Sequence, residues 1–299
     1  MKERPVELRN LLTFQTVADA GSYGRAAAQL GYTQSTITVH IQQLEQDLGV
    51  QLFQKVGRRM ALTSEGAAVL DEARQLLNLA AQLEEGCRGG NRLDGTLKVA
   101  VAETVLCYLL GPVLREFREE APGVSMKIYA KTCAQTPESL KDGTCDLGIS
   151  YRGSWDEGRF DARLLTEVAL VPVAAPEHAA IDLTVPQQTL QLPLIVDEPD
   201  SVIRQAFDDY LAKRRIDHGG TVEMWSTQAI KCCVAAGMGF TVLPRFAVEE
   251  DLAAGTLVPL RWQPQQETVG IWLARSRSRR VTAAMSLFEE TLCRHCVSS

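Results

Sequence analysis

The residues with the clearest potential for chemistry are cysteines. The segment Cys293–Cys296, with sequence Cys-Arg-His-Cys, places two thiols beside an imidazole, and Cys232–Cys233 are adjacent. Cys107 and Cys133 follow predicted strands. Thiols in such positions could sense oxidants or bind a thiophilic metal. A structural zinc site usually needs four ligands at defined spacing, and the sequence offers one such pair. We therefore predict no metal site and keep a redox- or metal-responsive sensor as an alternative.

The patterns of enzymes and cofactor-binding folds are missing. Gly237-Met238-Gly239 lacks the later glycine of a dinucleotide turn, and no P-loop is present. Gly148–Arg152 resembles a serine-hydrolase elbow, but Arg152 stands where glycine is needed. The four histidines show no metal-ligand pairing with carboxylates. We expect a protein that is not an enzyme, with no catalytic residues and no cofactor.

Composition and charge point to a globular protein with one basic region. Of 299 residues, 45% are apolar and 23% are charged, and the net charge is −6. Residues 1–60 contain seven basic and five acidic side chains, so they carry +2 and the remainder carries −8. No apolar stretch approaches the length of a membrane span, and residues 1–10 do not resemble a signal peptide. We expect a cytoplasmic protein, in which any contact with nucleic acid would be confined to about residues 1–65.

The basic region reads as three short helices. Leu8–Ala20 has an apolar face and ends at Gly21, and Ser22 is a suitable N-cap for Tyr23–Leu30. After Gly31, a third helix begins at Thr33 or Gln34 and runs to about Leu48. Its outward side chains are mostly uncharged hydrogen-bonding groups, namely Gln34, Ser35, Thr38, Gln42 and Gln43. Such groups suit a helix that reads base edges in the major groove.

A basic hairpin is predicted directly after the third helix. Residues 52–63 contain two short apolar ends around a glycine-containing tip. Lys55, Arg58 and Arg59 at this tip could reach DNA phosphates, as the wing of a winged helix-turn-helix does. We therefore predict a winged helix-turn-helix DNA-binding domain over residues 1–65.

A long helix is predicted over Thr63–Cys87, with Thr63 as its N-cap. Apolar residues recur at alternating intervals of four and three, at Val69, Ala73, Leu76, Ala80 and Leu83. This heptad spacing is typical of a coiled-coil seam, so these residues are predicted to form a homodimer. Residues 66–90 would be a linker and dimerisation helix, and Arg88–Asn91 would form a hinge.

The remaining two-thirds alternates strands and helices, one helix being expected over Leu106–Glu120, and this alternation predicts parallel sheets in two α/β lobes. Ligands in such folds bind at the carboxyl ends of strands, beside helix N-termini. The residues at those places are Glu103, Thr104, Lys131, Thr132, Cys133, Asp200, Ser201, Ser226 and Thr227. Each could equally be an ordinary helix cap.

Several ordered motifs make residues 7–66 similar to the DNA-binding domain of LysR-type transcriptional regulators. They are Phe14-x-x-Val17-x-x-x-Gly21-Ser22-Tyr23, Ala26-Ala27-x-x-Leu30, Gln34-Ser35-x-Ile37-Thr38, Leu44-Glu45-x-x-Leu48-Gly49-x-x-Leu52-Phe53 and Leu62-Thr63-x-x-Gly66. The resemblance implies that Gln34, Ser35 and Thr38 face DNA bases, and that Arg25, Lys55 and Arg58 hold phosphates. Two positions depart from the family, which usually has proline at Ser35 and often arginine at Val39.

The C-terminal region resembles the effector-binding domain of the same family, which is similar to periplasmic solute-binding proteins. The matching motifs are Asp146-Leu147-Gly148-Ile149, Val171-Pro172-x-x-x-Pro176-x-His178 and Gly237-Met238-Gly239-Phe240-x-x-Leu243-Pro244. The resemblance implies an effector domain over 91–299. Lobe one would be 94–165 plus 267–299, lobe two would be 166–266, and the chain would cross near 163–167 and 265–269.

The same resemblance maps an effector cleft onto Thr104, Thr132, Ser201 and Thr227. These hydroxyls could bind a small anion or a polar metabolite. Lys131 could add positive charge, whereas Glu103 would disfavour a nearby anion. The implied partners are double-stranded DNA, a small-molecule effector, a homodimer or tetramer, and RNA polymerase. An alternative of another class is a solute-binding or enzymatic α/β protein whose N-terminal domain only docks to partners.

Overall fold

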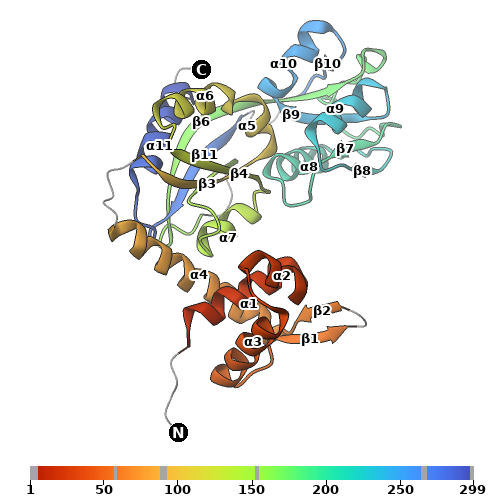
Figure 1. Cartoon of the computed structure of the whole chain (residues 1–299). Helices are drawn as coiled ribbons and strands as arrows, with labels where there is room; N and C mark the ends of the chain where they lie inside the picture. The colour runs from red at the N-terminus through yellow and green to blue at the C-terminus, as the bar shows by residue number, and fades with distance from the viewer. Residues whose placement is uncertain (1–5, 57–58, 88–92, 152–154, 264–267, 297–299) are drawn as a thin grey trace. The chain divides into compact units, whose positions relative to one another are not determined.

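The computed structural model describes residues 6–56, 59–87, 93–151, 155–263 and 268–296 (Figure 1). The chain forms two compact units, and each is described by itself. One consists of residues up to 90 together with 141–144, and the other contains the rest. The predicted hinge at 88–91 lies outside the described residues, as does part of the predicted crossover at 265–269.

The N-terminal unit begins with three helices whose ends follow from their capping residues. They are α1 (Leu8–Ala20), α2 (Tyr23–Leu30) and α3 (Gln34–Leu48). Gly21, Gly31 and Gly49 end them in the left-handed conformation, with φ between 63° and 71°. The Ser22 hydroxyl accepts the N–H of Arg25 at the start of α2, and the Thr33 hydroxyl accepts the N–H of Thr36 at the start of α3.

A two-stranded hairpin and a long helix complete this unit. β1 (Phe53–Val56) pairs antiparallel with β2 (Arg59–Leu62), and α4 (Ser64–Cys87) follows. Thr63 Oγ1 accepts the Gly66 N–H at 2.8 Å, which confirms Thr63 as the cap of α4. The core consists of buried side chains from all four helices and the hairpin, among them Phe14, Ile37, Leu44, Leu52, Phe53 and Ala73.

The second unit contains a mixed sheet. Its first part comprises β3 (Gly95–Val101), α5 (Glu103–Tyr108), α6 (Leu110–Glu120), β4 (Val124–Ala130), α7 (Gln135–Lys141), β5 (Leu147–Tyr151) and β6 (Phe160–Ala174). The chain continues through a short 3-10 helix (Pro176–His178), β7 (Leu194–Val196), α8 (Val202–Arg214), β8 (Thr221–Glu223), α9 (Thr227–Ala235), β9 (Phe240–Pro244), α10 (Arg245–Ala254), β10 (Val258–Pro259), β11 (Thr268–Ser276) and α11 (Ala283–Cys296).

The strand order divides the sheet into two lobes, and this division explains why the sheet contains both parallel and antiparallel strand pairs. The order is β4-β3-β5-β11-β6-β9-β7-β8. β3 is parallel to β4 and β5, and β7 is parallel to β8 and β9, as alternating strands and helices predict. The antiparallel pairs are those of β11 with β5 and β6, and of β6 with β9 and β10.

β6 runs from the first lobe into the second without a break (Figure 1). It pairs with β11 from Phe160 to Ala169 and with β9 from Leu170 to Ala174. The expected lobe boundary at 165/166 therefore lies inside one continuous strand.

The sequence predicts one helix over 106–120, but the structure has two. α5 ends at Tyr108 and α6 begins at Leu110. Pro112 explains the break because it has no N–H to donate to the Tyr108 carbonyl and its ring would clash with that group in a continuous helix.

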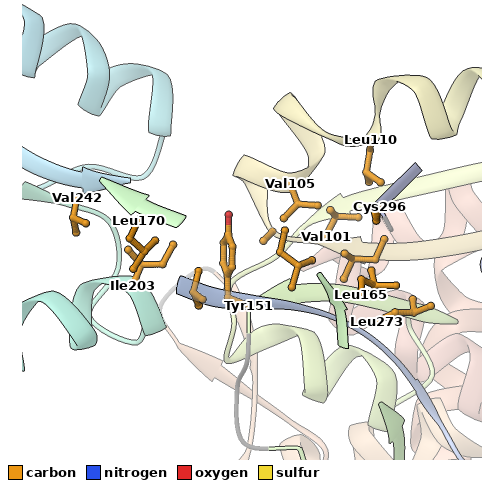
Figure 2. Close-up of a cluster of buried hydrophobic side chains, with 14 of the residues drawn as sticks. Val101, Val105, Leu110, Tyr151, Leu165, Leu170, Ile203, Val242, Leu273 and Cys296 are labelled. Carbon is orange, nitrogen blue, oxygen red and sulfur yellow. The ribbon is translucent and has the colours of Figure 1, made fainter. Parts of the chain in front are cut away.

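One hydrophobic cluster joins the two lobes. Figure 2 shows Tyr151 between Leu170, Ile203 and Val242 on one side and Val101 and Val105 on the other. Because apolar packing continues between the lobes, their strand ends stay close together beside Tyr151.

Candidate functional site

The outward face of α3 is polar and accessible at its N-terminal end. Gln34 and Ser35 are exposed, and Thr38 is partly exposed. The Thr38 hydroxyl donates to the Gln34 carbonyl at 3.0 Å, while the hydroxyls of Ser35 and Thr33 lie 2.8 Å apart. Val39 is 60% exposed, so its methyl groups are also free to meet a partner. This face can accept and donate hydrogen bonds without carrying charge.

The structure brings Arg25 to the same side of the unit as two of these residues. A surface hollow of about 680 Å³ lies among α2, α3 and the hairpin, and Arg25, Gln34, Thr38 and Gln42 all line it. Lys55 is exposed on β1. Arg58 lies outside the described residues, as does the side chain of Arg59.

Glu45 lines this hollow but serves the fold. Its Oε1 accepts the N–H of Leu52 at 2.8 Å, which fixes the turn between α3 and the hairpin. Burial, and secondarily the charge of Glu45, raise the pKa of Tyr23 to about 12. Tyr23 is therefore neutral at physiological pH.

His40 is half-buried on α3 and contacts two residues of its own unit. Its Nδ1 lies 3.0 Å from the Thr13 hydroxyl, and its ring packs edge-on against Tyr32.

The predicted seam of α4 is only partly exposed. Ala73 is buried and Val69 is partly buried in the core that α4 shares with α1, and Ala80 is partly buried. Leu76, Leu79 and Leu83 are 50%, 60% and 72% exposed. We call these three residues the α4 leucine row. They form an apolar stripe because residues three, four and seven apart share a helix face.

The four hydroxyl residues predicted at strand ends line one cavity. Thr104, Thr132, Ser201 and Thr227 surround a volume of about 250 Å³ between the lobes of the second unit. Thr104 follows β3, Thr132 follows β4, Ser201 precedes α8, and Thr227 begins α9. We call this cavity the cleft. Glu103, Lys131, Cys133 and Ser226 line it as well, whereas Asp200 does not appear in its lining.

Each hydroxyl already has a partner in the protein. Thr104 Oγ1 lies 2.5 Å from the Tyr151 hydroxyl, and Thr132 Oγ1 accepts the Gln135 N–H at 3.1 Å. Ser201 Oγ accepts the Arg204 N–H at 3.4 Å, so it caps α8. Some of these residues therefore also act as helix caps, as the sequence allowed.

Glu103 joins the lobes across the cleft. Its carboxylate accepts hydrogen bonds from the Thr227 N–H at 2.9 Å, the Thr227 hydroxyl at 2.8 Å and the Ser226 hydroxyl at 3.2 Å. A carboxylate of the first lobe thus caps the N-terminus of α9 in the second, where a negative charge is favoured.

The cleft contains further residues that the sequence reasoning missed, namely Gln135, Tyr151, Asp197, Glu198 and Trp225. The pKa of Asp197 is raised to about 7, mainly by burial and also by the charge of Glu198, although a hydrogen bond from Ser201 and the charge of Arg204 act to lower it. The signal that could have found Tyr151 and Asp197 is position, because they end or directly follow β5 and β7.

Three of the described cysteines have raised thiol pKa values. Burial raises the pKa of Cys107, Cys296 and Cys133, the last to about 11, so the reactive thiolate is disfavoured. His295 Nε2 lies 2.5 Å from Glu116 Oε2. Within the described residues, no group of three or more His, Cys, Asp or Glu side chains could hold a metal ion. None of the described helices is long and apolar enough to cross a membrane.

Comparison with known proteins gives two family matches. Residues 8–67 match the bacterial regulatory helix-turn-helix proteins of the lysR family, and residues 90–297 match the LysR substrate binding domain. The chain is 39% identical over 283 residues to the uncharacterized HTH-type transcriptional regulator YfiE of Escherichia coli (strain K12), covering 95% of this chain and 96% of that protein. It is 31% identical over 262 residues to YwqM of Bacillus subtilis (strain 168), an uncharacterized HTH-type transcriptional regulator, covering 86% and 89% respectively.

Solved structures share the fold at lower identity. Full-length OxyR from Pseudomonas aeruginosa matches with a TM-score of 0.71 and 22% identity, over 98% of this chain and 95% of that one. CbnR in complex with its target DNA matches with a TM-score of 0.66 and 24% identity, over 97% and 99%. The two family matches span nearly the whole chain and agree with the winged helix-turn-helix and two-lobed α/β units, so this chain belongs to the LysR family of DNA-binding transcriptional regulators.

Proposed function

We propose that this regulator reads DNA through the exposed start of α3 and that a small molecule in the cleft controls it. The observation that carries the first part is the shared placement of Arg25, Gln34 and Thr38 around one surface hollow. Gln34, Ser35 and Thr38 contact bases, while Arg25, Lys55, Arg58 and Arg59 contact phosphates. DNA contact is then confined to residues 1–65, 66–90 form the linker, and 91–299 form the effector domain.

Dimerisation uses the α4 leucine row. Leu76 and Leu83 belong to the expected seam, and exposure adds Leu79. Val69 and Ala73 contribute less to the dimer because their side chains pack within their own unit. The two DNA-binding domains of the dimer could then occupy two half-sites, as dimeric helix-turn-helix proteins do. A regulator that acts on bacterial DNA works in the cytoplasm.

The effector acts through the cleft, where Thr104, Thr132, Ser201 and Thr227 meet. A ligand that favours one arrangement of the lobes shifts the population of DNA-binding states by its difference in affinity between those states. The effector domain carries no catalytic role in this scheme. The raised pKa values of Cys107, Cys133 and Cys296 give no support to a redox sensor.

The experiment is a selection of duplexes from a random library, followed by anisotropy titrations. Gln34→Ala should bind the selected duplex more weakly while its binding to scrambled duplex stays unchanged, because base contacts supply discrimination. Gln46→Ala is the matched control, since Gln46 is exposed on α3 but does not line the hollow. Failure to enrich any sequence would refute the regulator proposal, and equal losses in both variants would refute the role of Gln34.

A further inference from the structure

Several hydrogen-bond donors that an anionic ligand could use in the cleft are already engaged with carboxylates of the protein. The N-terminus of α9 gives the Thr227 N–H and hydroxyl to Glu103, and Ser226 gives its hydroxyl to the same carboxylate. The Ser201 hydroxyl hydrogen-bonds to Asp197. An anion entering here would have to displace a carboxylate of the protein and would meet it at close range.

The charged side chains that line the cleft are mostly acidic. Glu103, Asp197 and Glu198 face a single ammonium group, that of Lys131. Arg204, which lies near Asp197, is engaged elsewhere. Its guanidinium donates to Glu223 at 2.9 Å and to the Asp197 carbonyl at 3.0 Å, and it lies 3.5 Å from Asp208. The cleft therefore offers more negative acceptors than positive donors.

An exposed aromatic ring borders the same cavity. Trp225 lines the cleft and is 73% exposed, although large aromatic side chains are usually packed in folded proteins. The face of an indole attracts cations, and this attraction is independent of the neighbouring carboxylates. The acidic lining and the exposed ring therefore both favour a cationic ligand.

We propose that the effector carries a protonated amine, which Asp197 and Glu198 bind as carboxylates while Trp225 covers it. This inference rests on the proposed function of the cleft as the effector site. Lys131 carries the opposite charge to the acidic groups, so a ligand with a second, anionic end would place that end at Lys131. A cation beside Asp197 also favours the ionised form of this residue, whose pKa is raised to about 7 mainly by burial.

The test uses ligands that differ only in their end groups. Full-length protein is melted with matched sets of three-carbon to six-carbon chains that carry two amines, one amine and one carboxylate, or two carboxylates. Cadaverine, 5-aminopentanoate and glutarate form the five-carbon set. We expect the amines to raise the melting temperature, with apparent dissociation constants lower than those of the diacids by about tenfold or more.

The variants assign any effect to the cleft. Glu198→Gln and Asp197→Asn keep side-chain shape and remove charge, so each should weaken amine binding by about tenfold. Asp200→Asn is the control, because Asp200 is an exposed acid of the same loop that does not line the cleft. Preference for the diacids, equal binding of all three classes, no stabilisation by any set, or amine binding unchanged in both variants would overturn the proposal.

Binding to the selected duplex distinguishes failure of this proposal from failure of the proposed regulator function on which it rests. If no duplex is bound selectively, the regulator function itself fails, whatever binds in the cleft. If duplex binding is selective and diacids are the ligands that alter it, the regulator stands and only the amine class is wrong.

Discussion

Glu103 of the first lobe accepts two hydrogen bonds from Thr227 of the second, one from its backbone N–H at 2.9 Å and one from its hydroxyl at 2.8 Å. Both residues line the cleft, and their contact satisfies the first backbone N–H of α9, that of Thr227. It links the binding of a ligand to the distance between the lobes, because a ligand that competes for either residue must part them.

Replacing Glu103 with alanine should destabilise the effector domain. The change leaves the α9 N-terminus without its cap and removes three hydrogen bonds, so we expect the free energy of unfolding to fall by about 1–2 kcal/mol. Urea denaturation measures this loss. Glu119→Ala, at an exposed position of α6, is the control. Equal stability of both variants would mean that the Glu103–Thr227 contact contributes nothing to the lobe interface.

Removing the charge of Lys55 should weaken binding to every duplex alike. Lys55 is exposed on β1, and a phosphate contact carries no sequence information. Lys55→Ala should lower affinity for selected and scrambled duplexes by the same factor and should reduce the salt dependence of binding by about one ion. Anisotropy titrations over a series of salt concentrations provide both values. Loss of affinity for the selected duplex alone would assign Lys55 to base reading instead.

Truncating the α4 leucine row should weaken the dimer. Leu76→Ala combined with Leu83→Ala removes two side chains that are 50% and 72% exposed in the single chain. Each leucine buried in a dimer contributes about 1.5–3 kcal/mol, so the dissociation constant should rise by more than about tenfold. Sedimentation equilibrium measures it. Met238→Ala, which is exposed in the second lobe, is the control for loss of an apolar surface residue. An unchanged constant would place the dimer contact elsewhere.

Asp197 should make stability depend on pH. Its folded pKa of about 7 lies above the ordinary aspartate value of 3.8, so the unfolded state ionises first. Stability associated with protonated Asp197 is then present at low pH and is lost as pH rises toward 7. Glu198 and Arg204 flank Asp197, and Tyr151 and Cys133 approach from the first lobe. Asp197→Asn should therefore become more stable relative to the wild type between about pH 4 and pH 7. Parallel melting curves across this range would contradict the raised pKa, and Asp200→Asn should give such parallel curves.

The sequence was most informative where structure is local. Gly21, Ser22 and Thr63 mark helix ends through their own backbone and side-chain chemistry, so the predicted bounds agree with the structure closely. The split between α5 and α6 is also local, since Pro112 causes it, but helix periodicity alone hid it.

Long-range packing set the limits of prediction. Heptad spacing identified one face of α4, but it could not show that Val69 and Ala73 pack into the core of their own unit while Leu79 remains exposed. The rule of strand ends found Thr104, Thr132, Ser201 and Thr227 together. This rule did not reveal that Glu103 accepts hydrogen bonds from Thr227, because that contact joins residues 124 positions apart.

The passage of β6 through both lobes has a mechanical meaning. The ladder between β6 and β11 shifts register at Ile271/Trp272, opposite the stretch from Leu164 to Thr166. Such an irregularity increases local twist in a strand. Since a hydrogen-bonded strand rather than a flexible loop joins the lobes here, a change in the angle between them requires torsion of the sheet. Under the proposed function, the response to an effector would begin as a change in the winding of β6.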